Sequence, residues 1–302
     1  MYEQIAANKR RTFFLITGFV VLVAAVAGAI NYLVLEGGWV GMILALLFSG
    51  ALAFASYWNS DKVALAVSRA KPADPAVYRR LYNLVEGLTI ASGLPMPRIY
   101  VIEDPAPNAF ATGRNPRHAA IAVTTGLLEK MNRVELEGVL AHELSHIKNY
   151  DILISTLAVT MVGAIALVAD MALRFMWWGG GRRGGDRDRG PAGAILAMFG
   201  FLLLILAPLI AQLMHFAVSR NRESLADVSA VKMTRYPPGL ISALEKLKAD
   251  QTVVSSASRA TAHLWIEQPT ARTRDQGPLS RLNRLFDTHP PLEERIAALR
   301  EL

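Results

Sequence analysis

The stretch "LAHELSHIKNYDILISTLAVTMVGAIALVAD", residues 140–170, joins a polar segment with metal-ligand spacing to a long apolar run. On a helix, His142 and His146 are four residues apart and project from the same face, so both imidazoles can hold one ion. Glu143 lies beside the first of them and can reach a water on that ion without binding the ion itself. From Ile152 onward the residues are apolar enough to cross a membrane. The stretch therefore predicts a metal site next to a membrane span, on one helix that continues from the site into the span.

The pattern His-Glu-x-x-His is typical of hydrolytic zinc sites. Two imidazole nitrogens fix the metal, an open position holds a water, and the carboxylate accepts a proton from that water. The alternative is a chance match in a polar helix, because a motif this short recurs by accident. A third protein ligand elsewhere in the chain would favour the zinc site over the chance match.

Four stretches carry few or no charges and are long enough to cross a hydrocarbon core, which needs about 20 apolar helical residues. They are predicted as transmembrane helices at 12–35, 39–58, 152–175 and 192–218. The composition agrees, since 52% of the residues are hydrophobic and the mean hydropathy is +0.29. The first stretch follows a basic cluster and could be read as a cleaved signal peptide, but its apolar part is longer than such a peptide needs.

These spans divide the chain into two membrane hairpins and one polar domain. The hairpins are residues 1–58 and 152–218, and the polar domain is formed by residues 59–151 and 219–302. Lys and Arg gather at one set of span ends, which the positive-inside rule assigns to the cytoplasm together with both termini. The loop 179–190 carries four arginines on the opposite side and is the observation against this orientation.

A candidate third ligand follows the fourth predicted span, in "NRESLADVSA". It is Glu223, and Asp227 lies four residues later on the same helical face, where it could accept the outer N–H of a ligand histidine. The alternative is a solvated start of a helix with both carboxylates in water. Two spans separate His146 from Glu223, and an even number of crossings returns the chain to the same side. The predicted topology therefore favours the ligand role.

The polar domain is predicted to be α+β, with several helices and a small sheet. The segment 74–93 begins with Asp-Pro, has apolar residues at helical spacing and ends at Gly, which predicts a helix. The segments 98–103 and 119–126 are rich in β-branched residues and predict strands. Asn132 and Glu135 have the spacing of a capping box at the start of the helix that carries the His-Glu-x-x-His motif. Residues 251–280 predict a mobile loop that could serve as a lid.

Four motifs together resemble one protein family. They are "NAFATG" (108–113), "AHELSHIKNYD" (141–151), "SRNRESLAD" (219–227) and "THPPLEERI" (288–296). In order and spacing, over nearly the whole chain, the sequence resembles the HtpX family of membrane-bound zinc metalloproteases. The resemblance implies a mainly helical, gluzincin-like protease domain with one Zn²⁺ held by His142, His146 and Glu223, and Glu143 as the catalytic carboxylate. It also implies a cytoplasmic active site in the inner membrane and degradation of misfolded membrane proteins under stress, with membrane protease or chaperone partners.

The resemblance extends to residues with open alternatives. His289, in the "HPP" turn, is the best remaining donor for a developing oxyanion, and its alternative is a surface histidine. Arg295 either orients a carboxylate near the metal or pairs on a helix surface. Asn108, Ala109, Phe110 and Ala111 suit an edge strand to which an extended substrate adds, and the alternative is a plain core strand.

Two other functions compete with this interpretation. A protease that trims prenylated CAAX proteins shares the same short motifs, but such enzymes resemble larger proteins with seven spans. A membrane scaffold with a structural zinc would normally close all four metal positions, often with Cys, and this chain has no cysteine. The net charge of +7 is assigned to contact with anionic lipid, because the basic clusters flank apolar runs and no basic-aromatic motif indicates nucleic acid.

Overall fold

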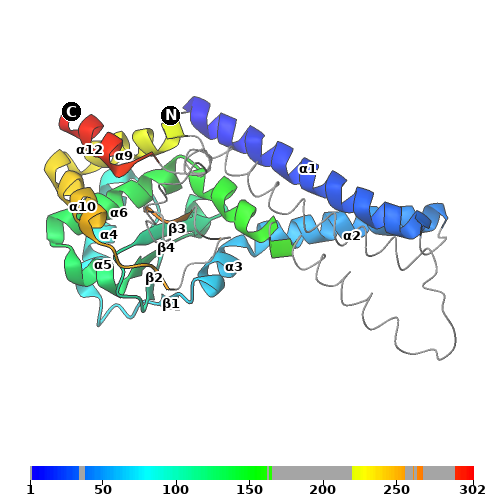
Figure 1. Ribbon diagram of the computed structural model, residues 1–302, viewed down its shortest axis with the longest axis horizontal. Coiled ribbons are helices and arrows are strands. Elements are labelled where there is room, and N and C mark those ends of the chain that lie inside the picture. Colours follow the sequence, from blue (N-terminus) through cyan, green and yellow to red (C-terminus); the bar gives the residue numbers. More distant parts are fainter. Residues whose placement is uncertain are drawn as a thin grey trace, which may run out of the picture.

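A helical hairpin extends from one end of the molecule (Figure 1). It consists of α1 (Tyr2–Leu33) and α2 (Trp39–Trp58). The computed structural model of the chain describes residues 2–33, 38–161, 163–164, 220–255, 261, 264–267 and 290–302. Within these residues, α2 is the one helix that is long and apolar enough to cross a membrane.

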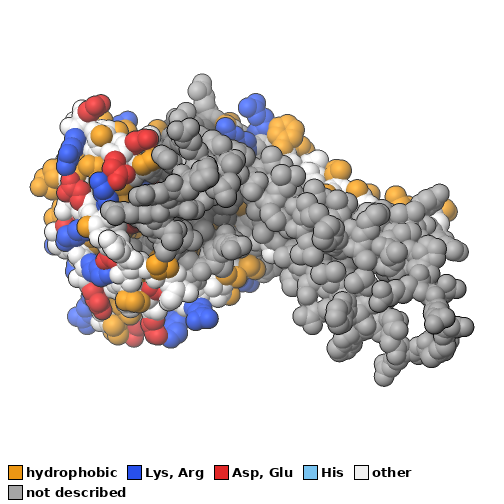
Figure 2. All heavy atoms as spheres, viewed as in Figure 1, with side chains coloured by type: hydrophobic (Ala, Val, Ile, Leu, Met, Phe, Trp, Pro, Cys, Tyr) orange, Lys and Arg blue, Asp and Glu red, His pale blue; other side chains and the backbone are white. Residues whose placement is uncertain are grey.

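The surface of α2 suits an apolar environment. The buried residues of α2 are all small, and they are Ala45, Ser49, Ala53 and Ser56. Small residues let two helices approach closely, while large ones such as Leu47 and Phe54 remain exposed. Figure 2 shows hydrophobic side chains along the described part of the hairpin, whereas most of the visible charged side chains lie at the opposite end of the molecule, among hydrophobic and other groups. Exposed apolar groups of this size and number fit lipid better than water.

The predicted spans agree with the described helices to different extents. Helix α1 contains most of the first predicted span, and α2 coincides with the second. Of the third, the structure describes the helix Asp151–Met161, which packs against α1 and α2 through Leu157 and Met161. The fourth, 192–218, lies outside the described residues. The division into two membrane hairpins therefore stays a prediction.

The polar domain contains a small sheet, as the sequence predicts, and the sheet is mixed. Its strands are β1 (Lys71–Pro72), β2 (Arg98–Ile102), β3 (Ala109–Gly113) and β4 (Ala119–Thr124), in the order β1-β2-β4-β3. The pair β2–β4 is parallel and the other two pairs are antiparallel. Ile121 and Val123 of β4 pack into the main core, while Ala120 and Ala122 face Phe110 and Trp265 on the other side. Both faces of the sheet are therefore buried.

Helix α6 (Arg133–Lys148) lies at the centre of the polar domain. Its neighbours are α4 (Arg79–Ser92), α9 (Arg220–Thr234), α10 (Pro237–Ala249) and β3. The remaining described helices are α3 (Ser60–Val67), α5 (Thr125–Lys130), α12 (Leu292–Arg300) and a short 3-10 turn, Pro116–His118. The predicted capping box is confirmed, since Glu135 N donates to Asn132 Oδ1 at 3.0 Å and Asn132 N donates to Glu135 Oε2 at 2.8 Å. This cap fixes where α6 begins.

The helix predicted over 74–93 begins later than expected. Asp74 does not cap a helix; its Oδ1 accepts the N–H of Ala76 at 2.8 Å, which makes a local turn. Helix α4 starts only at Arg79 and ends, as predicted, at Gly93, whose φ is +70°. The Asp-Pro pair therefore marks a turn before the helix and not the helix itself.

Helix α6 does not continue into the apolar run that follows it, although residues 140–170 predict one continuous helix. It ends at Lys148, and Tyr150 has φ +60°, a left-handed conformation that a helix cannot include. A new helix begins at Asp151. The break separates the segment that carries the metal-site motif from the apolar helix.

The packing of α6 on α10 depends on Gly138. A Cβ at this position would lie 2.8 Å from Leu240 N and 2.9 Å from Leu240 Cα. We expect Gly138→Ala to lower the free energy of unfolding by about 1–3 kcal/mol, because the helices must separate. The control is Gly87→Ala on α4, where the described structure places no atom within 4 Å of the new Cβ. This change should stabilise the protein by up to about 1 kcal/mol. Urea denaturation in detergent followed by circular dichroism measures both, and equal effects would contradict the packing argument.

Candidate metal centre

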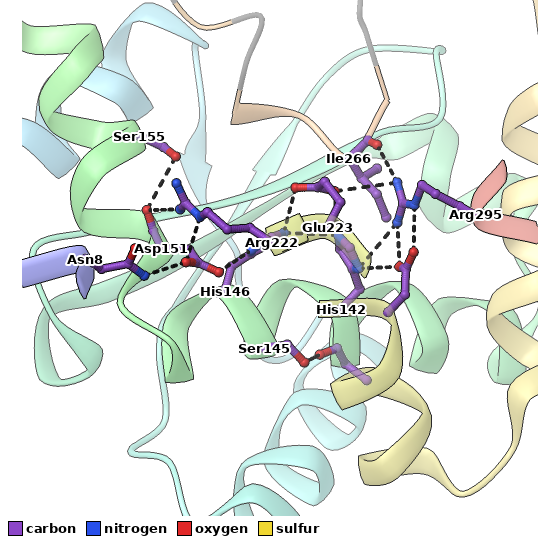
Figure 3. A network of polar contacts seen from close by, with 12 residues as sticks. Asn8, His142, Ser145, His146, Asp151, Ser155, Arg222, Glu223, Ile266 and Arg295 are labelled. Atoms are coloured by element: carbon purple, nitrogen blue, oxygen red, sulfur yellow. Dashed lines mark hydrogen bonds and ion pairs between the residues drawn. The ribbon is translucent and has the colours of Figure 1, made fainter. Parts of the chain in front are cut away.

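The predicted ligands His142, His146 and Glu223 meet between α6 and α9 (Figure 3). The two Nε2 atoms of the histidines are 3.1 Å apart. His142 Nε2 lies 3.5 Å from Glu223 Oε2, and His146 Nε2 lies 3.5 Å from Glu223 Oε1. His142 and Glu223 are buried, and 15% of the His146 side chain is exposed. One residue of α9 and two from successive turns of α6 therefore point toward a common centre.

These separations fit a tetrahedral zinc ion. Ligand atoms about 2.0–2.1 Å from zinc at tetrahedral angles lie about 3.4 Å from one another. The three measured separations of 3.1, 3.5 and 3.5 Å lie close to this value. Two imidazoles and one carboxylate are also a ligand set that leaves one position open. The residues present can hold a catalytic zinc without rearrangement of the helices.

Asp227 and Arg295 support the His142 side of the centre. His142 Nδ1 lies 2.8 Å from Asp227 Oδ1. Arg295, from α12, binds the same carboxylate with two nitrogens, Nε at 2.8 Å from Oδ2 and one terminal nitrogen at 2.7 Å from Oδ1. A second terminal nitrogen lies 3.7 Å from Glu223. All four side chains are buried, so Arg295 is a partner of buried carboxylates and not a member of a surface pair.

Opposite charges shift the pKa values of these groups. Burial and Arg295 lower the pKa of His142, but the carboxylates of Asp227 and Glu223 outweigh them and raise it to about 9. Burial raises the pKa of Asp227, and the positive charge of Arg295 with the His142 hydrogen bond brings it below the usual value. Burial lowers the pKa of Arg295, and its bond with Asp227 raises it overall. The surrounding carboxylates thus favour the protonated form of His142, and metal binding there would release a proton.

Glu143 lies on α6 next to His142 and is buried. Its negative charge is one of the causes that raise the pKa of Arg295, which is bonded to Asp227 beside His142. His289, the predicted oxyanion donor, lies outside the described residues. Five of the seven side chains predicted for the metal centre and its supports are in mutual contact, and they are His142, His146, Glu223, Asp227 and Arg295.

The predicted substrate strand, β3, is at the edge of the sheet, since β4 is its one paired strand among the described residues. The backbone groups of β3 that face away from β4 are already partly hydrogen-bonded, because Ile266 N donates to Ala109 O at 2.9 Å. The Asn108 side chain donates to Glu267 O at 2.9 Å. Trp265 is fully buried, with its ring 4.9 Å from that of Phe110. Within the predicted lid 251–280, the described residues 264–267 thus belong to the core.

Three residues near His146 were not found from the sequence. His146 Nδ1 lies 3.0 Å from Asp151 Oδ2, and Asp151 is in turn bound by Asn8 and Arg222. Asp151 and Arg222 both lie within the quoted motifs. His146 and Asp151 are five residues apart, and on a continuous helix their side chains would point in different directions, so the sequence does not predict their contact. Asn8 carries no local signal, because its partners Asn149 and Asp151 lie 141 and 143 residues away in the chain.

The chain is similar to several known proteins. A crystal structure of Ste24p from S. mikatae has a TM-score of 0.49 and 21% identity, covering 92% of this chain and 64% of that one. "Protease HtpX homolog" proteins from Streptococcus uberis and Lactobacillus helveticus are each 45% identical to this chain, over 100% of both sequences. The model of Peptidase family M48 matches residues 75–302, which include the metal centre. The chain therefore belongs to peptidase family M48 as an HtpX-like metallopeptidase.

Proposed function

We propose that the chain is a membrane-bound endopeptidase in which His142, His146 and Glu223 hold one zinc ion and Glu143 is the catalytic carboxylate. The observation that carries this proposal is the set of ligand separations, which match a tetrahedral zinc, with Glu143 adjacent on α6. Family membership supports a metallopeptidase, and α2 supports attachment to a membrane.

The side chains have separate tasks in peptide hydrolysis. A zinc ion at this centre would lower the pKa of a bound water and polarise the peptide carbonyl. Glu143 accepts the proton of the attacking water and returns it to the leaving nitrogen. Asp227 accepts a hydrogen bond from His142 Nδ1–H, which leaves Nε2 free of a proton and directed at the centre. Arg295 fixes Asp227 with two bonds and offsets the surrounding negative charge. His289 is proposed to donate to the developing oxyanion.

The substrates are proposed to be misfolded membrane proteins, cleaved at the cytoplasmic face of the inner membrane. The distribution of Lys and Arg along the sequence supports this orientation. In it, the chain crosses the membrane four times and both termini lie on the cytoplasmic side. The edge position of β3 supports binding of an extended segment along Asn108–Ala111. Because Ile266 already bonds to Ala109, such a segment would bind at Ala111 or displace Ile266. Membrane proteases or chaperones are the proposed partners.

The two competing functions have less support. Relatives that are 45% identical over the whole chain are named as HtpX proteases, which does not favour a CAAX-type enzyme. A structural zinc site would have no use for a buried carboxylate beside its first ligand, yet Glu143 is buried there.

Metal removal tests the proposal. We expect the purified protein in detergent to contain about one zinc per chain and to cleave unfolded casein. Treatment with 1,10-phenanthroline should abolish cleavage, and added zinc should restore it, because the water and the carbonyl are both activated by the metal. Zinc content by atomic emission and peptide release by mass spectrometry are the measurements. A protein that binds zinc without cleaving would instead be the scaffold, and cleavage that survives chelation would exclude the metal mechanism.

A further inference from the structure

The break after α6 places a carboxylate behind the second ligand histidine. His146 and Asp151 are five residues apart, which on a continuous helix would direct them about 140° from each other. The left-handed Tyr150, φ +60°, turns the chain so that Asp151 Oδ2 lies 3.0 Å from His146 Nδ1. A strained conformation in a non-glycine residue persists only where the surroundings hold it. The groups that hold this break therefore also hold Asp151.

Helix α1 contacts the three residues at the break, Asn149, Tyr150 and Asp151. The Asn8 side chain donates to Asn149 O at 2.9 Å and to Asp151 Oδ1 at 2.7 Å. The next residue, Lys9, has its ammonium 4.9 Å from the centre of the Tyr150 ring. Asn8, Asn149 and Asp151 are buried. The polar start of α1 thus packs directly against the segment that follows α6.

Helix α9 completes the environment of Asp151. Arg222 Nε donates to Asp151 Oδ1 at 2.8 Å, and a terminal nitrogen of Arg222 donates to the Asp151 backbone oxygen at 2.9 Å. Arg222 directly precedes the third ligand, Glu223. In Figure 3, Asn8, Arg222 and His146 converge on this one carboxylate from three different helices. One oxygen of Asp151 accepts from Asn8 and Arg222, and the other faces His146.

We propose that Asp151 is a positioning residue for His146 and that α1, through Asn8, is a structural part of the metal centre. The proposal rests on zinc binding at His142, His146 and Glu223. A carboxylate that accepts the Nδ1–H of His146 fixes the ring and its tautomer, so that Nε2 is directed at the metal. Asp227, on α9, accepts the Nδ1–H of His142 in the same way. Asp151 differs because its position depends on Asn8 of α1.

The test is zinc affinity, measured by competition with a fluorescent chelator on the full-length protein in detergent. Loss of a group that orients a ligand histidine typically weakens metal binding by about 10–100-fold. We expect Asp151→Asn to raise the zinc Kd within this range and Asn8→Ala to raise it by about 10-fold. In the double variant the effects should not multiply, because Asn8 acts through Asp151. The cobalt-substituted protein should show a changed d–d absorption band in each single variant.

The control is Thr12→Val, one turn further along α1, where the buried hydroxyl donates only to the backbone oxygen of Asn8 among the described contacts. Its zinc Kd should stay within about twofold of the parent value. If Asn8→Ala does not fold, Asn8→Ser, which keeps a short hydrogen-bonding group, replaces it. A parent protein that binds no zinc would refute the proposed function. A parent that binds zinc tightly, with variants of unchanged Kd and cobalt spectrum, would refute the positioning role alone, as would multiplicative effects in the double variant.

Discussion

Replacing Glu143 with glutamine is expected to lower kcat for peptide cleavage by about 10²–10⁴-fold, the usual contribution of a general base. The amide keeps the size of the side chain but cannot accept the proton of the attacking water. The zinc content should remain that of the parent, because Glu143 is not among the three groups that converge on the metal position. Initial rates of casein cleavage, together with zinc content, measure both effects.

The matched control is Glu137→Gln on the same helix. Glu137 is partly exposed and lies outside the group of side chains around the metal position. This variant should cleave at the parent rate. A Glu143→Gln protein that retains zinc and also cleaves at the parent rate would contradict the role of Glu143 as proton acceptor.

Replacing Arg295 with glutamine is expected to give the largest loss of stability. Arg295 is buried with two bonds to Asp227 and a third contact to Glu223, so its removal leaves buried carboxylates without their cation. Breaking a buried ion pair from one side typically costs about 3–5 kcal/mol. The loss should be greater in metal-free protein, because zinc supplies positive charge to the same carboxylates. Denaturation midpoints with and without zinc measure the difference.

Arg300→Gln on the same helix serves as its control. Arg300 pairs with Glu245 at 2.6 Å, with side-chain exposures of 64% and 48%. An exposed pair of this kind contributes at most about 1 kcal/mol. Equal destabilisation by the two substitutions, or no dependence of the Arg295 effect on zinc, would contradict the buried-charge interpretation.

The sequence predicts those parts of the centre that depend on one helix or on topology. His142 and His146 share a face because four residues make about one turn, and this holds wherever α6 packs. Strands 98–102 and 119–124 follow from β-branched residues and from their Gly and Pro boundaries. The capping box at Asn132 is likewise a local interaction, and the sequence predicts it at the observed residue.

The features that the sequence does not reveal depend on distant contacts. The break at Tyr150 opposes the local preference for a helix, and the contacts that hold it come from α1, far away in the chain. The partner of His146 is Asp151 only because of that break. At Asp74 the error has a local cause, because the side chain can cap a turn as readily as a helix. The contact of Ile266 with the edge of β3 has no sequence signal at all.

The most direct test of the metal centre is an anomalous difference map, recorded at the zinc absorption edge, from crystals of the zinc-loaded Glu143→Gln protein. We expect one peak about 2.0–2.2 Å from His142 Nε2, His146 Nε2 and a carboxylate oxygen of Glu223. A map with its zinc peak at other residues, or with no peak in protein whose parent form cleaves casein, would contradict the proposed centre.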